Sequence, residues 1–184
     1  MARLCIFCGA RPGNGDRFRD VAVQTAQAAV AAGYGIVYGG GRVGLMGAVA
    51  DATLAAGGEI IGVIPAALAS AEIAHHGLTQ LHVVQSMHER KALMADLSDG
   101  FIALPGGFGT MDEFHEILTW RQLGIHNKSI VLLNVDGYYD ELLALYEHML
   151  QEGFIRPQSR ALFTACASVD AALNALRDTS YSAG

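Results

Sequence analysis

The sequence predicts an α/β fold with a doubly wound, mostly parallel sheet of about seven strands and helices on both faces. Short β-rich runs alternate with longer stretches of helical periodicity, which is typical of βαβ units. Most of the short runs are continuously apolar, as in strands that are covered on both sides. The 184 residues are 52% apolar and contain no evident linker, so we expect one Rossmann-like domain over residues 1–184.

Taken in order, the strands and helices account for most of the chain. The expected strands are Leu4–Cys8, Gly35–Tyr38, Ile60–Ile64, Leu81–Val84, Phe101–Leu104 and Ile130–Leu133, with Leu162–Cys166 as a candidate seventh. The expected helices are Phe18–Ala32, Leu45–Ala56, Met87–Leu97, Met111–Gln122, Tyr138–Glu152 and Val169–Arg177. Residues 65–80 suggest a short helix plus a loop, and the small polar residues 179–184 suggest a frayed tail.

The overall charge argues against a polyanionic partner. A formal charge of −6 and a pI near 5.5 do not suit a broad contact with nucleic acid or with an anionic membrane surface. The first eight residues are too short an apolar run for a signal peptide, and no later run approaches membrane-spanning length. We therefore expect a cytoplasmic protein that holds any anion through local contacts.

The cysteines and the paired histidines have simple structural interpretations. Cys5 and Cys8 have the spacing of a redox pair, but they lie in a β-type run, whereas a thioredoxin-type pair begins a helix. Buried thiols in a reducing compartment are the simpler interpretation. His75 and His76 have no third ligand at a fixed spacing, so a solvated loop is favoured over a metal site.

A first glycine-rich turn follows the second expected strand. Residues 39–44 satisfy G-x-G-x-x-G, the dinucleotide-binding pattern. That pattern also needs an acidic residue at the end of the next strand, but Glu59 stands at its beginning. The alternative is a tight turn that lets the helix at 45–56 pack closely on the sheet.

A second turn, Pro105-Gly106-Gly107-Phe108-Gly109-Thr110, is the more specific signal for ligand binding. It joins a buried strand to a helix and supplies three glycines before a threonine with a capping side chain. Glycines let successive backbone N–H groups converge, and a helix N-terminus adds positive potential. The turn is therefore a candidate phosphate-binding site for a small nucleotide.

Three carboxylates, Asp112, Glu113 and Glu116, follow this turn on the same helix. Thr110 and Glu113 have capping-box spacing, so Glu113 is either a cap or a catalytic acid, and the cap is favoured when the helix is considered alone. Carboxylates beside a bound phosphate would repel it unless a cation shares the site. The pattern therefore calls for an arginine or for a positively charged transition state.

Arg90 is the candidate cation. Ser86 and Glu89 form a second capping box, and the helix that follows places Met87, Arg90, Met94 and Leu97 on one face. A charged group on an apolar face points inward and needs a partner or a ligand. A structural ion pair with Asp96 or Asp99 is the alternative, and Lys91 either is solvated or reaches the same anion.

These residues resemble the LONELY GUY (LOG) family of cytokinin riboside 5′-monophosphate phosphoribohydrolases, often labelled lysine decarboxylase-like. Met87-His88-Glu89-Arg90-Lys91 is similar to the family's MHxRK motif, and residues 105–113 are similar to its PGGxGTxxE motif, in the usual order and separation. Supporting similarity covers nearly the whole chain, including residues 38–41, 44–47, 62–65, 119–126 and 134–139.

The resemblance implies hydrolysis of the N-glycosidic bond of an adenosine 5′-monophosphate with an N6 substituent. It implies a free base and ribose 5-phosphate as products, no cofactor, no metal, and a homodimer with the site near the subunit interface. It assigns catalysis to Arg90 and Glu113. The residues that it places around the substrate are Glu72, Lys91, Gly106, Gly107, Phe108, Gly109, Thr110, Met111, Asp112 and Thr119.

The chain departs from the family pattern at three places. Ala10 and Arg11 follow Cys8-Gly9 where the family commonly has serines, so a hydroxyl contact to the nucleotide is in doubt. Arg42 stands where a small residue is usual, and either adds a phosphate contact or projects into solvent. Ser129 replaces a common proline at the entry to a strand and should leave the chemistry unchanged.

Two competing functions follow from the same features. A carrier of a nucleotide-like molecule such as molybdenum cofactor would share the fold and the glycine-rich turns but would leave AMP intact. A pyridoxal-phosphate decarboxylase would need a Schiff-base lysine, and Lys91 and Lys128 are the two lysines of the chain.

Overall fold

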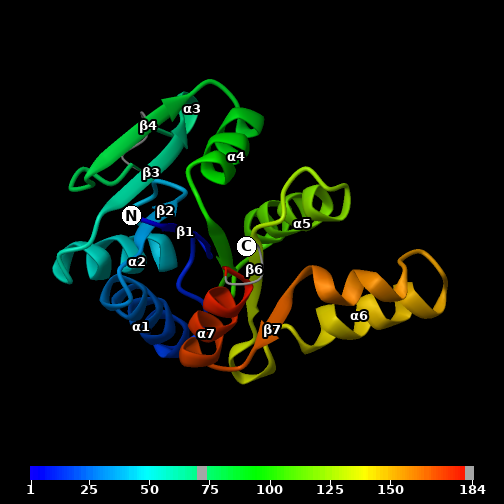
Figure 1. Ribbon diagram of the computed structural model, residues 1–184. Helices are drawn as coiled ribbons and strands as arrows, with labels where there is room; N and C mark the ends of the chain where they lie inside the picture. Colours follow the sequence, from blue (N-terminus) through cyan, green and yellow to red (C-terminus); the bar gives the residue numbers. More distant parts are fainter. Residues whose placement is uncertain (70–73, 181–184) are drawn as a thin grey trace.

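A seven-stranded parallel sheet organises the molecule. The computed structural model describes residues 1–69 and 74–180 (Figure 1). The strands are β1 (Arg3–Phe7), β2 (Gly35–Tyr38), β3 (Ile60–Pro65), β4 (Gln80–Val84), β5 (Gly100–Ala103), β6 (Ser129–Leu133) and β7 (Thr164–Cys166). All neighbouring pairs are parallel, in the order β4-β3-β2-β1-β5-β6-β7. The predicted fold class is confirmed.

The helices form a layer on each face of the sheet. They are α1 (Arg17–Ala31), α2 (Gly44–Ala55), α3 (Ala66–Leu68), α4 (Met87–Asp96), α5 (Phe108–Gln122), α6 (Asp140–Gln151) and α7 (Val169–Ser180), with short 3-10 helices at Val135–Gly137 and Pro157–Leu162. The apolar residues of α1, α2 and α7 pack on one face, and those of α4 and α5 pack on the other. α6 projects beside α5, away from the sheet (Figure 1).

Alternating side chains of the strands supply both halves of the core. In β1, Leu4 and Ile6 join the cluster under α1 and α2, whereas Cys5 and Phe7 join the cluster under α4 and α5. This is the period of two expected for a strand. The same alternation places Cys5 and Cys8 in opposite clusters, and both thiols are buried and free, which agrees with the structural interpretation of the pair.

The element boundaries differ from the predicted ones at three informative places. α5 begins at Phe108 rather than Met111, because the chain turns into the helix directly after Gly107. Leu162 ends the 3-10 helix at Pro157–Leu162, so β7 begins only at Thr164. α7 extends to Ser180, two residues into the segment that was expected to be a frayed tail.

The chain changes direction across the sheet between β1 and β5. From β1 it builds outward through β2, β3 and β4, and then returns to the other side of β1 as β5. Crevices of this kind, at the carboxyl ends of parallel strands, are where open α/β sheets bind ligands. The loops after β1 and β5 meet there, since the Gly9 N–H donates to the Pro105 carbonyl at 3.2 Å.

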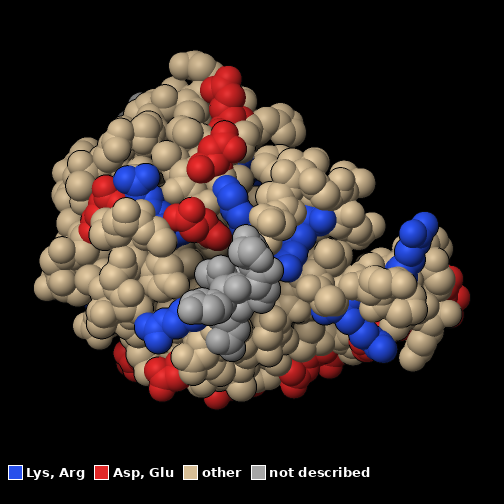
Figure 2. Space-filling model, in the orientation of Figure 1, with Lys and Arg blue, Asp and Glu red and all other residues tan. Residues whose placement is uncertain are grey.

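The face of the molecule seen in Figure 2 carries basic and acidic side chains that are scattered rather than gathered in one basic patch. Among the described residues, no helix has both the length and the apolar content that crossing a bilayer requires.

Close backbone contact holds the loop after β2 against the loop after β1. Gly44 has a positive φ of 63°, and a Cβ atom there would lie 2.4 Å from the Ala10 carbonyl carbon and 2.6 Å from the Arg11 nitrogen. The Leu45 N–H donates to the Gly9 carbonyl at 3.0 Å. The close contact between the two loops therefore requires glycine, which has no side chain, at position 44.

The substitution Gly44→Ala should destabilise the protein more than Gly57→Ala. Gly57 also has a positive φ, 73°, but a Cβ atom there would meet nothing within 4 Å. The control should lose about 1 kcal/mol from the backbone conformation alone, whereas Gly44→Ala should lose roughly 1–3 kcal/mol more from steric overlap. Chemical denaturation measures both, and equal losses would contradict the close contact.

Candidate functional site

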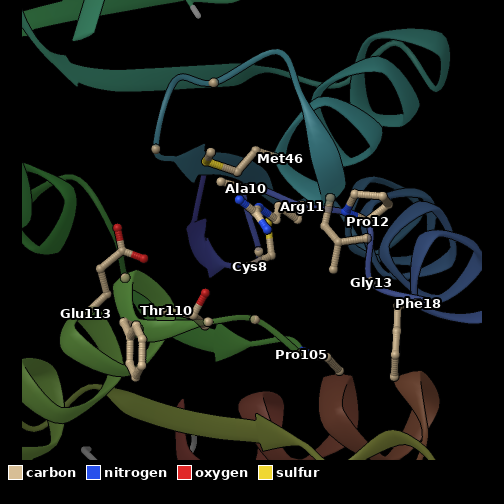
Figure 3. Close-up of a pocket in the computed structure, with 18 of the residues that line it drawn as sticks. Cys8, Ala10, Arg11, Pro12, Gly13, Phe18, Met46, Pro105, Thr110 and Glu113 are labelled. Atoms are coloured by element: carbon tan, nitrogen blue, oxygen red, sulfur yellow. The ribbon is translucent and has the colours of Figure 1, made fainter.

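A cavity of about 510 Å³ opens at the crevice between β1 and β5. Its walls come from the loops after β1, β2 and β5, the first turns of α2 and α5, Arg90 of α4 and Tyr138. Figure 3 shows Cys8, Ala10 and Met46 on one side of this space and Pro105, Thr110 and Glu113 on the other. The volume lies in the range that small-molecule sites occupy.

A buried ion pair joins α4 to α5 beside this cavity. Arg90 Nη1 lies 2.9 Å from Glu113 Oε1, and the two residues are only 8% and 6% exposed. The guanidinium also donates to the Val63 carbonyl at 3.0 Å and to the Gly39 carbonyl at 3.3 Å. Arg90 therefore points inward as predicted, with Glu113 as its ion-pair partner.

The alternative partners proposed for Arg90 are not supported. Asp99 instead accepts a hydrogen bond from the Arg3 backbone at 2.8 Å, at the opposite edge of the sheet. Of the four residues predicted on the inward face, Met94 is buried, but Met87 is 41% exposed because it begins the helix. The predicted cap at the start of α4 is confirmed, since Ser86 Oγ accepts from the Glu89 N–H at 3.1 Å.

Gly39 makes room for the guanidinium. A Cβ atom at this position would lie 2.0 Å from Arg90 Nη2. The first glycine of the G-x-G-x-x-G pattern thus clears space for a side chain of the site. Glu59, the acid that a dinucleotide site would have needed, pairs with Arg3 at 2.8 Å, remote from the cavity. The tight-turn interpretation of residues 39–44 is the one that fits.

The capping role considered for Glu113 is wrong. α5 begins at Phe108 with Gly107 as its N-cap and no side-chain cap, so Thr110 lies inside the helix, where it is 3% exposed. Glu113 then falls in the second turn and faces Arg90 rather than a free N–H group. Burial, partly offset by the charge of Arg90, raises the pKa of Glu113 to about 7. Perturbed carboxyl groups of this kind favour a functional site.

The turn at 105–110 presents unpaired backbone donors. Among the described residues, none accepts a hydrogen bond from the N–H groups of residues 106–110, and the helical pattern of α5 begins with Met111 N–H donating to the Gly107 carbonyl. A Cβ atom on Gly106 would overlap Thr110, whereas Gly107 and Gly109 face space that is empty within 4 Å. The converging N–H groups can hold an anion.

Several of the residues that sequence assigned to the substrate do not line this cavity. Lys91 is 7% exposed and pairs with Glu116 at 2.7 Å and Asp112 at 3.0 Å. Asp112, Met111 and Thr119 line a second, shallower hollow on the other side of α5, and Phe108, which is 97% exposed, borders both spaces. Glu72 lies outside the described residues.

Several parts of the cavity wall carried no signal in the sequence, among them Phe18, Ile64 and Leu68. Residues 9–13, apart from the noted Ala10 and Arg11, carried no motif, although a glycine-rich loop after the first strand was a usable signal. Tyr138 was not predicted there either, because nothing in its spacing shows that it reaches the turn after β5. Within the described residues, no three His, Cys, Asp or Glu side chains gather in a way that could hold a metal ion.

Comparison with known proteins places this site in a family. A family model described as "Possible lysine decarboxylase" matches residues 46–176. A cytokinin riboside 5′-monophosphate phosphoribohydrolase of Rhodococcoides fascians is 52% identical over 95% of this chain and 88% of its own length. An Arabidopsis thaliana protein of the same name is 43% identical over 96% of this chain and 83% of its own length.

The fold of this chain is also similar to that of solved structures. The molybdenum cofactor binding protein of Rippkaea orientalis superimposes with a TM-score of 0.74 over 97% of both chains, at 20% identity. At that identity the match shows a shared fold only. The extent of the family-model match and the identity to two named relatives show that the chain belongs to the LOG family, whose general description is possible lysine decarboxylase.

Proposed function

We propose that this protein is a phosphoribohydrolase that cleaves the N-glycosidic bond of adenosine 5′-monophosphate or an N6-substituted derivative. The observation that carries the proposal is the buried Arg90–Glu113 pair at 2.9 Å, which lies beside a cavity bordered by an anion-binding turn. The relatives named above support the same substrate class. The family membership fits this chemistry, because both relatives are named as phosphoribohydrolases of a riboside 5′-monophosphate.

In the proposed reaction, water replaces the base at the ribose C1′ atom. Departure of the base builds positive charge on the ribose, as in other glycoside hydrolyses. The Glu113 carboxylate stabilises that charge and orients the attacking water, and the 105–110 turn holds the 5′-phosphate and so supplies binding energy remote from the bond that breaks. The C1′–N bond breaks, a C1′–O bond forms, and one proton of the water ends on the base.

Arg90 acts in this scheme through its charge and its position. A guanidinium stays charged in proteins and does not serve as a conventional general acid. Its contacts to two backbone carbonyls and to Glu113 fix the carboxylate, and they leave the planar group beside the cavity for ribose or phosphate oxygens. We propose Gly106–Thr110 as the phosphate contacts and Glu72 as a further substrate contact, whereas Lys91 would act only through its ion pairs with Asp112 and Glu116.

The two competing functions fit the residues less well. Burial would lower the pKa of Lys91, but hydrogen bonds and charges from Glu116 and Asp112 more than offset it and raise the pKa. A Schiff-base lysine needs the opposite shift. The second lysine, Lys128, donates to the Ala95 carbonyl at 2.8 Å. The named relatives are hydrolases, whereas a carrier would leave the nucleotide intact.

We propose in addition that the protein acts in the cytosol. We also propose that a second copy of the chain covers the outer surface of α5 and α6. An apolar cleft of about 620 Å³ lies between these helices, and Leu145 on α6 and Phe154 just beyond it are 46% and 85% exposed. In such a dimer, Met111, Asp112 and Thr119 would lie at the subunit interface rather than inside the cavity of their own chain. Light scattering of the purified protein tests the oligomeric state.

The substitution Glu113→Gln should lower kcat at least about 100-fold while nucleotide binding survives, because the amide keeps the shape but loses the charge. Chromatography of AMP and N6-isopentenyl-AMP reactions measures release of base and ribose 5-phosphate. Glu59→Gln is the matched control, since it removes a carboxylate from another Arg–Glu pair at the opposite edge of the sheet. Unchanged kcat in Glu113→Gln would reject the catalytic role, and intact nucleotide with the wild-type protein would reject the function.

Replacing Arg90 with alanine should impair both folding and turnover. The change leaves Glu113 buried without its partner, which costs about 3–5 kcal/mol for broken buried pairs. Arg90→Lys should retain more stability but recover little kcat, because one ammonium cannot match the planar contacts. Thermal unfolding and initial rates measure both effects, with Arg3→Ala as the control, and full activity in Arg90→Lys would show that charge alone suffices.

The reaction should lose rate as the pH falls through about 7, the raised pKa of Glu113. Above that pH the carboxylate is ionised and kcat/KM is level, and below it kcat/KM should fall about tenfold per pH unit as the acid of the free protein is protonated. Since a phosphate monoester ionises near pH 6, ribose 5-phosphate inhibition over the same range reports the contribution of the phosphate. A kcat/KM that stays level down to pH 5 would contradict Glu113 as the ionising group.

A further inference from the structure

The turn at 105–110 can bind an anion only if its peptide groups keep their orientation, and glycine-rich backbone is free to rotate. Two donors from outside the turn contact it. The Gly9 N–H donates to the Pro105 carbonyl at 3.2 Å, and the Tyr138 hydroxyl donates to the Gly106 carbonyl at 2.7 Å. Each contact therefore fixes one of two consecutive peptide planes.

A trans peptide holds its C=O and N–H groups on opposite sides of one plane. With the Gly106 carbonyl bound to Tyr138, the N–H of Gly107 must point away from that hydroxyl. A flip of this peptide would carry the carbonyl oxygen to the side where the N–H now lies. There it would repel an anion held by the N–H groups of the following residues.

Tyr138 is itself held in place, so its hydroxyl is a fixed donor. Its ring meets Phe18 edge-on at 5.4 Å between ring centres and Tyr139 at 4.8 Å. Tyr138 lines the cavity and is 44% exposed, so burial does not oblige its hydroxyl to find a protein partner. The hydrogen bond to the Gly106 carbonyl therefore points to a role in orienting the turn.

We propose that Tyr138 is a positioning residue for phosphate: its hydroxyl, bonded to the Gly106 carbonyl, aims the Gly107 N–H at the 5′-phosphate of the substrate. The inference rests on the proposed function for the identity of the substrate. It does not depend on turnover, because ribose 5-phosphate, the proposed product, carries the same phosphate.

The test is Tyr138→Phe, which removes the hydroxyl and keeps the ring against Phe18, so folding is preserved. Calorimetric titration with ribose 5-phosphate should give a Kd about fivefold higher than wild type, the loss expected for one hydrogen bond. The Kd for adenine, which lacks phosphate, should change less than twofold. In kinetics, KM for the nucleotide should rise by the same factor while kcat stays within twofold.

Tyr34→Phe is the matched control, because Tyr34 precedes β2 at the opposite edge of the sheet and should leave both Kd values unchanged. Equal ribose 5-phosphate affinity in Tyr138→Phe and wild type would overturn the inference, as would equal weakening of adenine or a wild-type protein that binds no ribose 5-phosphate. A wild-type protein that binds ribose 5-phosphate but releases no base would refute the proposed function alone, and the Kd ratio would still decide the role of Tyr138.

Discussion

The site depends on one buried contact, the ion pair between Arg90 and Glu113. Removing two charges from water is costly, and their mutual attraction repays that cost only when further hydrogen bonds satisfy both groups. Here the Val63 and Gly39 carbonyls each accept a further hydrogen bond from the guanidinium. The contact thereby joins the loop after β2 to β3, α4 and α5, and the absence of a side chain at Gly39 leaves room for it.

The position of the cavity follows from the order of the strands. β1 and β5 are neighbours in the sheet but far apart in sequence. The chain leaves β1 toward β2 and leaves β5 toward β6, on opposite sides, so the loops that follow these two strands lie next to each other at the crevice. The molybdenum cofactor binding protein of Rippkaea orientalis shares this fold at 20% identity. Chemistry is added by particular side chains placed at that crevice, so the fold by itself does not identify the reaction.

Periodicity predicted the sheet, its helices and the inward direction of Arg90, because these depend on local patterns of apolar residues. It left the partner of Arg90 open between Asp96 or Asp99 and the carboxylates that follow the second turn, since α4 and α5 are brought together only by their packing on the same face of the sheet. The capping box predicted at Thr110 does not form for a related reason. The glycines let the helix begin at Phe108, and Glu113 pairs with Arg90 of another helix. The contact between Tyr138 and Gly106 spans 32 residues and leaves no trace in spacing.

Two consecutive residues of α4 pair with three carboxylates of α5. Successive side chains on a helix are about 100° apart, so Arg90 reaches Glu113 on the cavity side while Lys91 reaches Asp112 and Glu116 on the other. These ion pairs fix the rotation of α4 about its axis and its position along α5. A substitution at Lys91 would leave Asp112 and Glu116 without this partner and would disturb the placement of Glu113 without touching the cavity.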